Sequence, residues 1–111
     1  MAKHVLIALT SPVEGKEDEY NRWYNEIHIP EILSVPGITS ARRFRVKVAQ
    51  IPGAATAKYV AIYEVETDNL GATLKALGEA TGEVIEALDQ SASGTIVAKE
   101  IFSLLEQSSS P

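Results

Sequence analysis

Four short runs of strand-forming residues alternate with two segments of helical spacing, and this order constrains the fold more than any single motif. The strands are expected at 5–9, 38–48, 59–65 and 94–105, and the helices within 14–33 and 68–88. Strand, helix, strand, strand, helix, strand is the order of a ferredoxin-like α+β domain. It predicts a four-stranded antiparallel sheet with both helices on one face.

The sheet face opposite the helices is expected to be apolar. The first and third strands, Val5 to Leu9 and Tyr59 to Val65, place apolar side chains on both sides. Monomers seldom expose an apolar patch of that size, so we expect a homodimer whose two sheets pack together. The alternative is a monomer that exposes Tyr59, Tyr63 and the arginines of the second strand.

Length and composition indicate one domain. Residues 1–106 of the 111 are assigned to it, and the polar residues 107–111 to a disordered tail. The absence of cysteine excludes disulfides and thiolate chemistry. A net charge of −5 opposes nucleic-acid binding, and no apolar run reaches the roughly 18 residues of a membrane span. Without a signal-peptide pattern, we expect a cytoplasmic protein with no membrane partner.

The first helical segment carries the densest aromatic cluster in the chain. Tyr20, Trp23, Tyr24 and Ile27 lie at i, i+3, i+4 and i+7, which predicts one buried face. Pro30 lacks an amide hydrogen, so the regular helix is expected to end or kink beside it, with a further turn before the Pro-Gly pair at 36–37.

His28 flanks this buried face and is the candidate for acid–base catalysis. An imidazole titrates near neutral pH and both accepts and donates protons. The topology predicts that His28 lies near His4 and Tyr63. The alternative is a histidine that hydrogen-bonds the free carbonyls of a helix end.

The candidate substrate-binding residues surround His28 in the predicted fold. The hydroxyls of Tyr24, Tyr59 and Tyr63 would donate hydrogen bonds to a carbonyl or phenolate, and Arg43 would balance negative charge. Trp23 completes this set. Two histidines without cysteine do not make a zinc site, and no phosphate-binding glycine loop follows a strand, so no metal or other cofactor is expected.

The segment WYNEIHIPEILSVPGITSARRF resembles the EthD-like branch of the dimeric α/β-barrel, or ferredoxin-like, superfamily. In that family an aromatic pair on the first helix precedes a histidine, a proline follows two residues later, and Pro-Gly leads into the second strand. The matching residues are Trp23, Tyr24, His28, Pro30, Pro36 and Gly37. The resemblance implies a homodimer with a small pocket in each subunit and cofactor-independent processing of organic compounds, and the family histidine corresponds to His28.

These observations lead to one main interpretation and two alternatives. The main one is a cofactor-independent lyase, cyclase or isomerase that acts on a small apolar, aromatic or carbonyl-containing compound, with His28 as general acid or base. The first alternative is a non-catalytic small-molecule-binding or accessory protein that uses the same pocket. The second is an oxygen-using monooxygenase, and a fold by itself does not choose among them.

Overall fold

The computed structural model describes residues 2–48, 57–82 and 84–104. Its strands are β1 (Ala2–Thr10), β2 (Ile38–Arg45), β3 (Tyr59–Thr67) and β4 (Gly94–Lys99). They form one sheet in the order β2-β3-β1-β4, and every neighbouring pair is antiparallel. The sequence predicts a connection between the second and third strands at 51–55 and a disordered tail at 107–111. Both segments lie outside the described residues.

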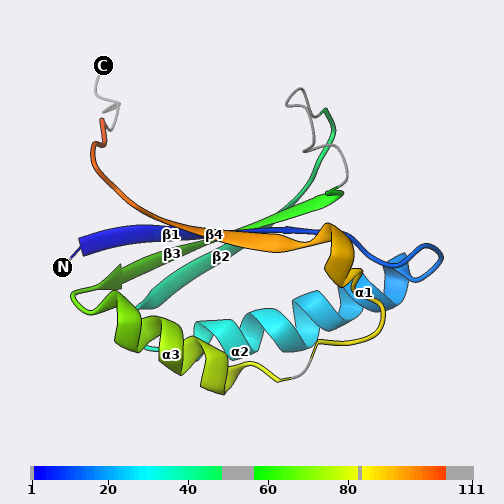
Figure 1. The fold of residues 1–111 in the computed structure, drawn as a ribbon, viewed down its shortest axis with the longest axis horizontal. Coiled ribbons are helices and arrows are strands. Elements are labelled where there is room, and N and C mark those ends of the chain that lie inside the picture. Colours follow the sequence, from blue (N-terminus) through cyan, green and yellow to red (C-terminus); the bar gives the residue numbers. More distant parts are fainter. Residues whose placement is uncertain (1, 49–56, 83, 105–111) are drawn as a thin grey trace, which may run out of the picture.

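The helices lie on one face of the sheet (Figure 1). They are α1 (Glu17–Trp23), α2 (Ile29–Leu33) and α3 (Leu70–Ala80). A π-helical turn, Tyr24–His28, joins α1 to α2, and a 3-10 turn, Gln90–Ala92, precedes β4. This arrangement confirms the predicted ferredoxin-like α+β fold. Within the ranges given above, no helix has the length and apolar character that crossing a membrane requires.

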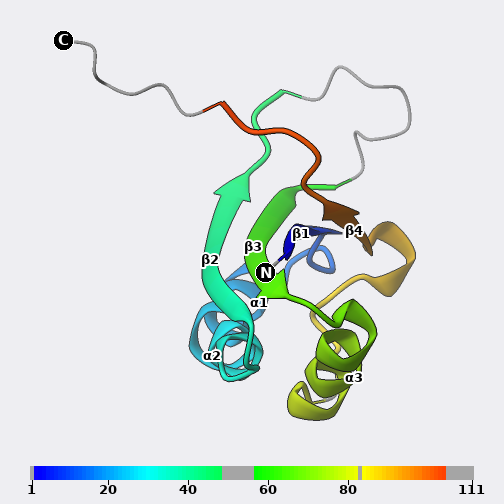
Figure 2. The ribbon, with the colours of Figure 1, turned by 90° about the vertical axis from the view of Figure 1, so that its left-hand side faces the viewer.

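The two central strands, β1 and β3, divide their side chains strictly between the two faces. The inner side chains, under the helices, are buried; they are His4, Leu6, Ala8 and Thr10 of β1 and Tyr59, Ala61, Tyr63 and Val65 of β3. The alternate side chains, such as those of Ile7 and Ile62, point to the outer face. None of the described helices covers that face (Figure 2).

The first helix does not end at Pro30, as one reading of the sequence predicted, but continues to Leu33. The helix changes its winding just before the proline: the amide of Ile29 donates to the carbonyl of Tyr24, five residues earlier. Pro30 then occupies the first turn of α2, where a missing amide hydrogen is tolerated. The expected interruption is therefore a π turn rather than a helix end.

The π turn also explains why the predicted buried face is only partly correct. Tyr20, Trp23 and Tyr24 are buried, but Ile27 is 51% exposed. A turn held by i→i+5 hydrogen bonds contains more residues than an α-helical turn, so positions after Tyr24 no longer follow α-helical spacing. The prediction that Ile27 lies in the core is wrong for this reason.

The helix α3 ends at Ala80, although apolar residues keep helical spacing as far as Leu88. Thr81 is already extended, and the chain then bonds to the loop that follows β1. The amide of Val13 donates to the carbonyl of Ala87 at 2.6 Å. Because these backbone groups bind a distant segment, the helix predicted within 68–88 ends at Ala80.

The last strand is shorter than the predicted 94–105, because its partner strand β1 begins at Ala2 and offers no further residues to pair with. The amide of Glu100 donates to the carbonyl of Lys3 at 2.8 Å, near the first residue of β1. The following residues, Ile101 to Leu104, are not in a strand and extend away from the sheet (Figure 1). We call residues 100–104 the C-terminal arm.

Candidate functional site

A cavity of about 260 Å³ opens beside the π turn. It lies between the first helix, the inner face of the sheet and the segment that leads into β4. Its lining residues are Ala8, Thr10, Trp23, Tyr24, His28, Val84, Leu88, Gln90, Ser93, Gly94 and Thr95. Three of the predicted site residues, Trp23, Tyr24 and His28, are therefore brought together in one wall of the cavity.

The aromatic neighbours of His28 fix the orientation of its ring. The imidazole stacks on the Trp23 indole, with ring centroids 4.5 Å apart and an angle of 18° between the planes. Tyr24 meets the imidazole edge-on at 5.0 Å. Trp23 and His28 are five residues apart, and the i→i+5 bonds of the π turn bring such residues to the same side of the helix. The same turn that accommodates Pro30 therefore builds the aromatic wall.

Burial lowers the pKa of His28 from its ordinary value of 6.5, and the nearby Glu31 carboxylate partly opposes this effect. The Nδ1 atom lies 3.8 Å from the Glu31 Oε1 atom, which is too long for a hydrogen bond. Among the described residues, this buried Nδ1 has no hydrogen-bond partner. At neutral pH the imidazole is therefore uncharged and able to accept a proton.

Three buried tyrosines, Tyr20, Tyr24 and Tyr63, lie in or next to the cavity wall. Tyr63 donates to the Tyr24 hydroxyl at 3.4 Å, and the Thr10 and Tyr20 hydroxyls share a hydrogen bond. Burial raises the pKa of all three tyrosines, so each stays protonated over the physiological range. Tyr63 does not line the cavity itself; it reaches the cavity through Tyr24.

Arg43 lies behind Tyr24 and not in the cavity. Its guanidinium carbon is 4.3 Å from the centroid of the Tyr24 ring. The two terminal nitrogens donate to the side-chain oxygens of Asn25, at 2.7 Å, and Asn21, at 2.8 Å. These bonds hold the positive charge against the tyrosine ring faces, which attract cations. Any effect of Arg43 on the cavity is transmitted through Tyr24.

Tyr59, also a predicted site residue, lies away from His28. Its hydroxyl donates to the Glu17 carboxylate and accepts a hydrogen bond from Asn21 at 3.2 Å. The hydrogen bond from the Tyr59 hydroxyl lowers the pKa of Glu17, and the charge of Arg45 lowers it further. Tyr59 and Arg45 line a separate polar depression, so Tyr59 does not share the cavity with His28.

The prediction that His28 lies near His4 is not met at the cavity. The cavity is lined by Ala8 and Thr10, near the end of β1, whereas His4 lies near the beginning of that strand. The cause is the length of the helix. Because the helix continues five residues beyond His28, and each residue adds 1.5 Å, His28 lies well before the helix end.

Four polar wall residues were missed by the sequence-based prediction. Gln90, Ser93 and Thr95 come from the approach to β4, where no periodic pattern identifies a pocket. Thr10 could have been found, because it shares the inner-face parity of Ala8 on β1. In the described ranges, no group of three or more His, Asp or Glu side chains is arranged to hold a metal ion.

Comparison with known families identifies the chain. Residues 6–75 match the model of a family described as a domain of unknown function, DUF4286. The chain belongs to this family. The match runs from β1 into α3 and includes His28 and its aromatic neighbours, but the family description names no activity. A search of curated proteins by sequence finds no match.

Three solved structures show the same fold. A candidate monooxygenase from Shewanella loihica has a TM-score of 0.60 and 18% identity, covering 93% of this chain and 99% of that one. An ethyl tert-butyl ether d (EthD) family protein from Bacillus halodurans has a TM-score of 0.51 and 15% identity, covering 91% of this chain and 100% of that one. A dimeric ferredoxin-like protein of unknown function from Jannaschia sp. has a TM-score of 0.64 and 11% identity, covering 89% of this chain and 99% of that one. The resemblance to EthD-like, ferredoxin-like proteins is thus confirmed for the fold.

Proposed function

We propose that this chain is a cofactor-independent lyase, cyclase or isomerase that moves a proton on a small aromatic or carbonyl-containing compound. The observation that carries the proposal is the position of His28: an imidazole of lowered pKa, stacked on Trp23, in the wall of a cavity. Cavities that combine apolar walls with a perturbed titratable group are the usual places for such chemistry.

His28 acts as the general base in this proposal. Its neutral imidazole takes a proton from a carbon or hydroxyl of the bound compound and returns it at another position or to a leaving group. Stacking on Trp23 limits rotation of the ring, so the imidazole is already oriented when the ligand binds. Tyr24 and Thr10 also line the cavity, and in this proposal their hydroxyl groups turn toward the ligand and stabilise the oxyanion that forms when the proton leaves.

The cavity favours a small and largely apolar ligand. Ala8, Val84 and Leu88 supply apolar surface, and the rings of Trp23 and Tyr24 supply faces for stacking. A volume of about 260 Å³ lies just below the usual range for ligand pockets of roughly 300–1,000 Å³. A single- or double-ring aromatic compound is of the right size.

The proposal includes a homodimer. The apolar outer face of the sheet is not covered by any described helix, and a second sheet is the simplest cover for it. The structural neighbour from Jannaschia sp. is described as dimeric, which supports the same arrangement for this chain.

The test begins with a search for ligands. Aromatic acids, phenols and quinones are screened by thermal shift, because a compound that binds the native state raises the melting temperature. Compounds that bind are then incubated with the protein in D₂O, and exchange of their carbon-bound hydrogens is followed by proton NMR. This assay detects proton transfer even when the final product is unknown.

His28→Gln should slow the exchange by about 100-fold or more while the variant remains folded. The matched control is His4→Gln, since His4 is the other histidine of the chain and does not line the cavity. Ligand binding without any exchange would assign the chain to the non-catalytic alternative. Product formation that stops under argon would instead indicate an oxygen-dependent reaction.

A further inference from the structure

Glu31, in the first turn of α2, carries a carboxylate that lies beside His28. The two residues are three positions apart, and α-helical winding resumes at Ile29, so their side chains are neighbours on the helix surface. The Glu31 Oε1 atom lies 3.8 Å from the His28 Nδ1 atom. Glu31 therefore reaches the side of the ring that bears Nδ1.

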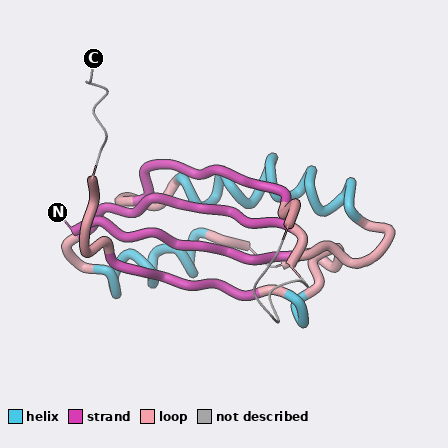
Figure 3. The backbone as a smooth tube through the Cα atoms, turned by 90° about the horizontal axis from the view of Figure 1, so that it is seen from above, coloured by secondary structure: helices cyan, strands magenta, loops and turns pink. Residues whose placement is uncertain are grey.

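A second contact holds the Glu31 carboxylate from the side of α3. The amide of Gly82, which follows α3, donates to the Glu31 Oε1 atom at 3.2 Å. The helices α2 and α3 lie side by side on the same face of the sheet (Figures 2 and 3). A Cβ atom at Gly82 would lie only 3.3 Å from the Glu31 Oε2 atom, so glycine permits this close approach. The carboxylate is thus held between two helices, and its side chain is 30% exposed.

The described surroundings of His28 supply no other charge at the cavity. The wall residues from the strands and from the segment after α3 are all uncharged; they are Ala8, Thr10, Val84, Leu88, Gln90, Ser93, Gly94 and Thr95. Tyr24 is the titratable group that contacts the imidazole, and burial raises its pKa, so it stays neutral. Arg43 contacts Tyr24 but does not line the cavity. Glu31 is therefore the carboxylate placed to act on His28.

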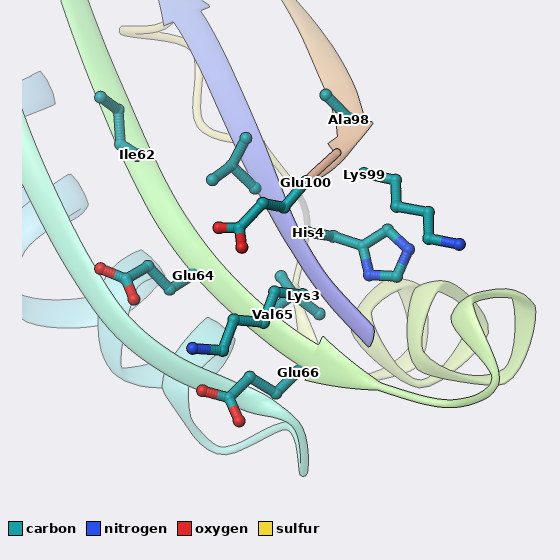
Figure 4. Close-up of a pocket in the computed structure, with 10 residues that line it drawn as sticks. Lys3, His4, Ile62, Glu64, Val65, Glu66, Ala98, Lys99 and Glu100 are labelled. Atoms are coloured by element: carbon teal, nitrogen blue, oxygen red, sulfur yellow. The ribbon is translucent and has the colours of Figure 1, made fainter. Parts of the chain in front are cut away.

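The other histidine of the chain, His4, has no such neighbour. Its Nδ1 atom is also buried without a hydrogen-bond partner among the described residues. Figure 4 shows His4 beside Lys99, its register partner on β4. Strand alternation directs His4 to the inner face, whereas Glu64 and Glu66 point to the outer face. Within the described ranges no carboxylate is paired with His4, so it serves as an internal reference for His28.

Protonation of His28 would strengthen its interaction with Glu31. When Nε2 accepts a proton, the ring becomes a cation whose Nδ1–H group is buried, and a buried charge without a partner is costly. Shortening the Nδ1 to Oε1 distance by about 1 Å would give the usual length of a charge-assisted hydrogen bond. The cation is a stronger donor than the neutral Gly82 amide, which shares the same oxygen atom.

We infer that Glu31 is a positioning residue for His28: its carboxylate holds the proton of the neutral imidazole on Nδ1, so that Nε2 accepts the proton of the bound compound. This inference rests on the proposed role of His28 as general base. In that step a C–H or O–H bond of the compound breaks, its electron pair stays on the compound, and an N–H bond forms at Nε2. Nδ1 keeps its own proton and Glu31 stays ionised. Return of the proton from Nε2 restores the neutral ring.

The protonated ring nitrogen can be identified without a bound compound. In protein labelled with the NMR-active nitrogen isotope, two-bond proton–nitrogen spectra distinguish a ring nitrogen that bears hydrogen from one that does not. Above the pKa of His28, the native chain should carry the proton on Nδ1. Glu31→Met keeps the approximate length of the side chain but removes its acceptor. This variant should change the ratio of the two tautomers by at least about fivefold in favour of Nε2–H.

Glu31→Gln separates the hydrogen bond from the charge. Its amide oxygen still accepts from Gly82 and from Nδ1, so the Nδ1–H form should remain. Loss of the negative charge should lower the pKa of His28 further, because the native carboxylate raises it. A variant that only loosened the packing would expose the imidazole and move its pKa the other way, toward the ordinary value of 6.5. The direction of the change therefore distinguishes positioning from a structural role.

The matched control is Glu26→Gln, an exposed glutamate two residues before His28. Glu26 is not among the groups that shift the pKa of His28, so this variant should leave the tautomer and the titration of His28 unchanged. The signals of the His4 ring should be the same in all variants. Circular dichroism checks that each variant is folded.

The same variants then test the chemistry. Exchange in D₂O is measured with the screened phenol, quinone or aromatic acid that gives the largest rise in melting temperature. Glu31→Met should slow this exchange by about tenfold, because most of its imidazole carries the proton on the wrong nitrogen. In Glu31→Gln the fall of the rate at acidic pH should begin at a lower pH than in the native chain, following the pKa of His28.

The outcomes separate this inference from the proposed function. An unchanged tautomer ratio in Glu31→Met, or a pKa of His28 that rises in Glu31→Gln, would overturn the inference. Exchange that requires His28 but is unaffected by both Glu31 variants would also overturn it, while the proposed function stands. A tautomer that depends on Glu31, in a protein that exchanges none of the compounds, would support the pairing and remove only the proposed function.

Discussion

The two faces of the sheet are built from the same strands but from different chemistry. On β3 the inner positions include Tyr59 and Tyr63, which make hydrogen bonds under the helices, while the outer positions include Val60 and Ile62, which make none. The inner face is buried by the protein's own helices, and the outer face has no such cover in the described chain. Alternation along one strand therefore places hydrogen-bonded tyrosines under the helices and the aliphatic Val60 and Ile62 on the opposite side.

This difference has an energetic meaning. A buried polar group must keep its hydrogen bonds, so the inner face tolerates few substitutions. An aliphatic face requires only that water be excluded, and any partner of suitable shape supplies that. The inner face should therefore determine the stability of one subunit, and the outer face the association of two.

The sharpest way to break this contrast is to truncate one residue in the core between the helices and the inner face, and one on the outer face. Tyr20 on the first helix has no exposed surface, so Tyr20→Ala should cost about 3–5 kcal/mol of unfolding free energy. Ile62→Ala on the outer face should chiefly raise the dimer dissociation constant. Urea unfolding at several protein concentrations measures both. If the loss of unfolding free energy for Ile62→Ala does not depend on protein concentration, the outer face does not determine association and the contrast between the faces is wrong.

Removing the positive charge of Arg43, which lies against the tyrosine rings, should have the next largest effect on the free energy of unfolding. Arg43→Met deletes two charge-assisted hydrogen bonds, to Asn21 and Asn25, and the contact with the Tyr24 ring. We expect a loss of about 2 kcal/mol, measured by urea unfolding. Arg42→Met, on the outer face of the same strand, is the matched control and should change unfolding by less than about 0.5 kcal/mol. Equal losses would contradict a special role of the inner face.

His28 should give the inner face a dependence on pH. Because burial lowers its pKa in the folded state, the unfolded chain binds a proton first as the pH falls below about 6.5. Stability from the neutral imidazole is thus present above that pH and is lost as the pH falls through the lowered pKa. The stability advantage of the native chain over His28→Gln should be smaller at pH 5 than at pH 8, as thermal unfolding will measure. A constant difference would speak against a buried neutral His28.

The smallest effect is expected from Tyr63→Phe, which removes one hydroxyl from the inner face and keeps the ring. The bond to the Tyr24 hydroxyl is long, at 3.4 Å, so its loss should cost about 0.5–1 kcal/mol in urea unfolding. A loss above about 2 kcal/mol would mean that the hydroxyls behind the cavity are coupled more strongly than their spacing indicates.

Much of the fold could be predicted from the sequence because strand alternation is a local signal. The positions of Tyr59 and Ile62 on opposite faces follow directly from a period of two. The end of β4 could not be predicted this way, since it depends on where β1 begins. The same holds for the segment near Leu88, whose apolar residues keep helical spacing while its backbone bonds to a distant loop.

The site was predictable only where its residues share one element. Trp23, Tyr24 and His28 lie within six residues of each other on one helix, and all three line the cavity. Arg43 and Tyr59 lie on strands, and parity placed them on the correct face without giving their position along it. Their hydrogen bonds to Asn21, Asn25 and Glu17 draw them away from the cavity, and such long-range pairing leaves no pattern in the sequence.

The π turn has one last consequence, which concerns how such chains should be recognised. Five steps of an ordinary α-helix, at about 100° each, would point the histidine about 140° away from the tryptophan. A chain with the same residues from Trp23 to Pro30 but with a regular α-helix there would therefore expose its imidazole to water. The π-helical winding beside Pro30 brings Trp23 and His28 together. The amino-acid sequence of this segment therefore indicates its family, whereas the winding decides whether the imidazole lines the cavity.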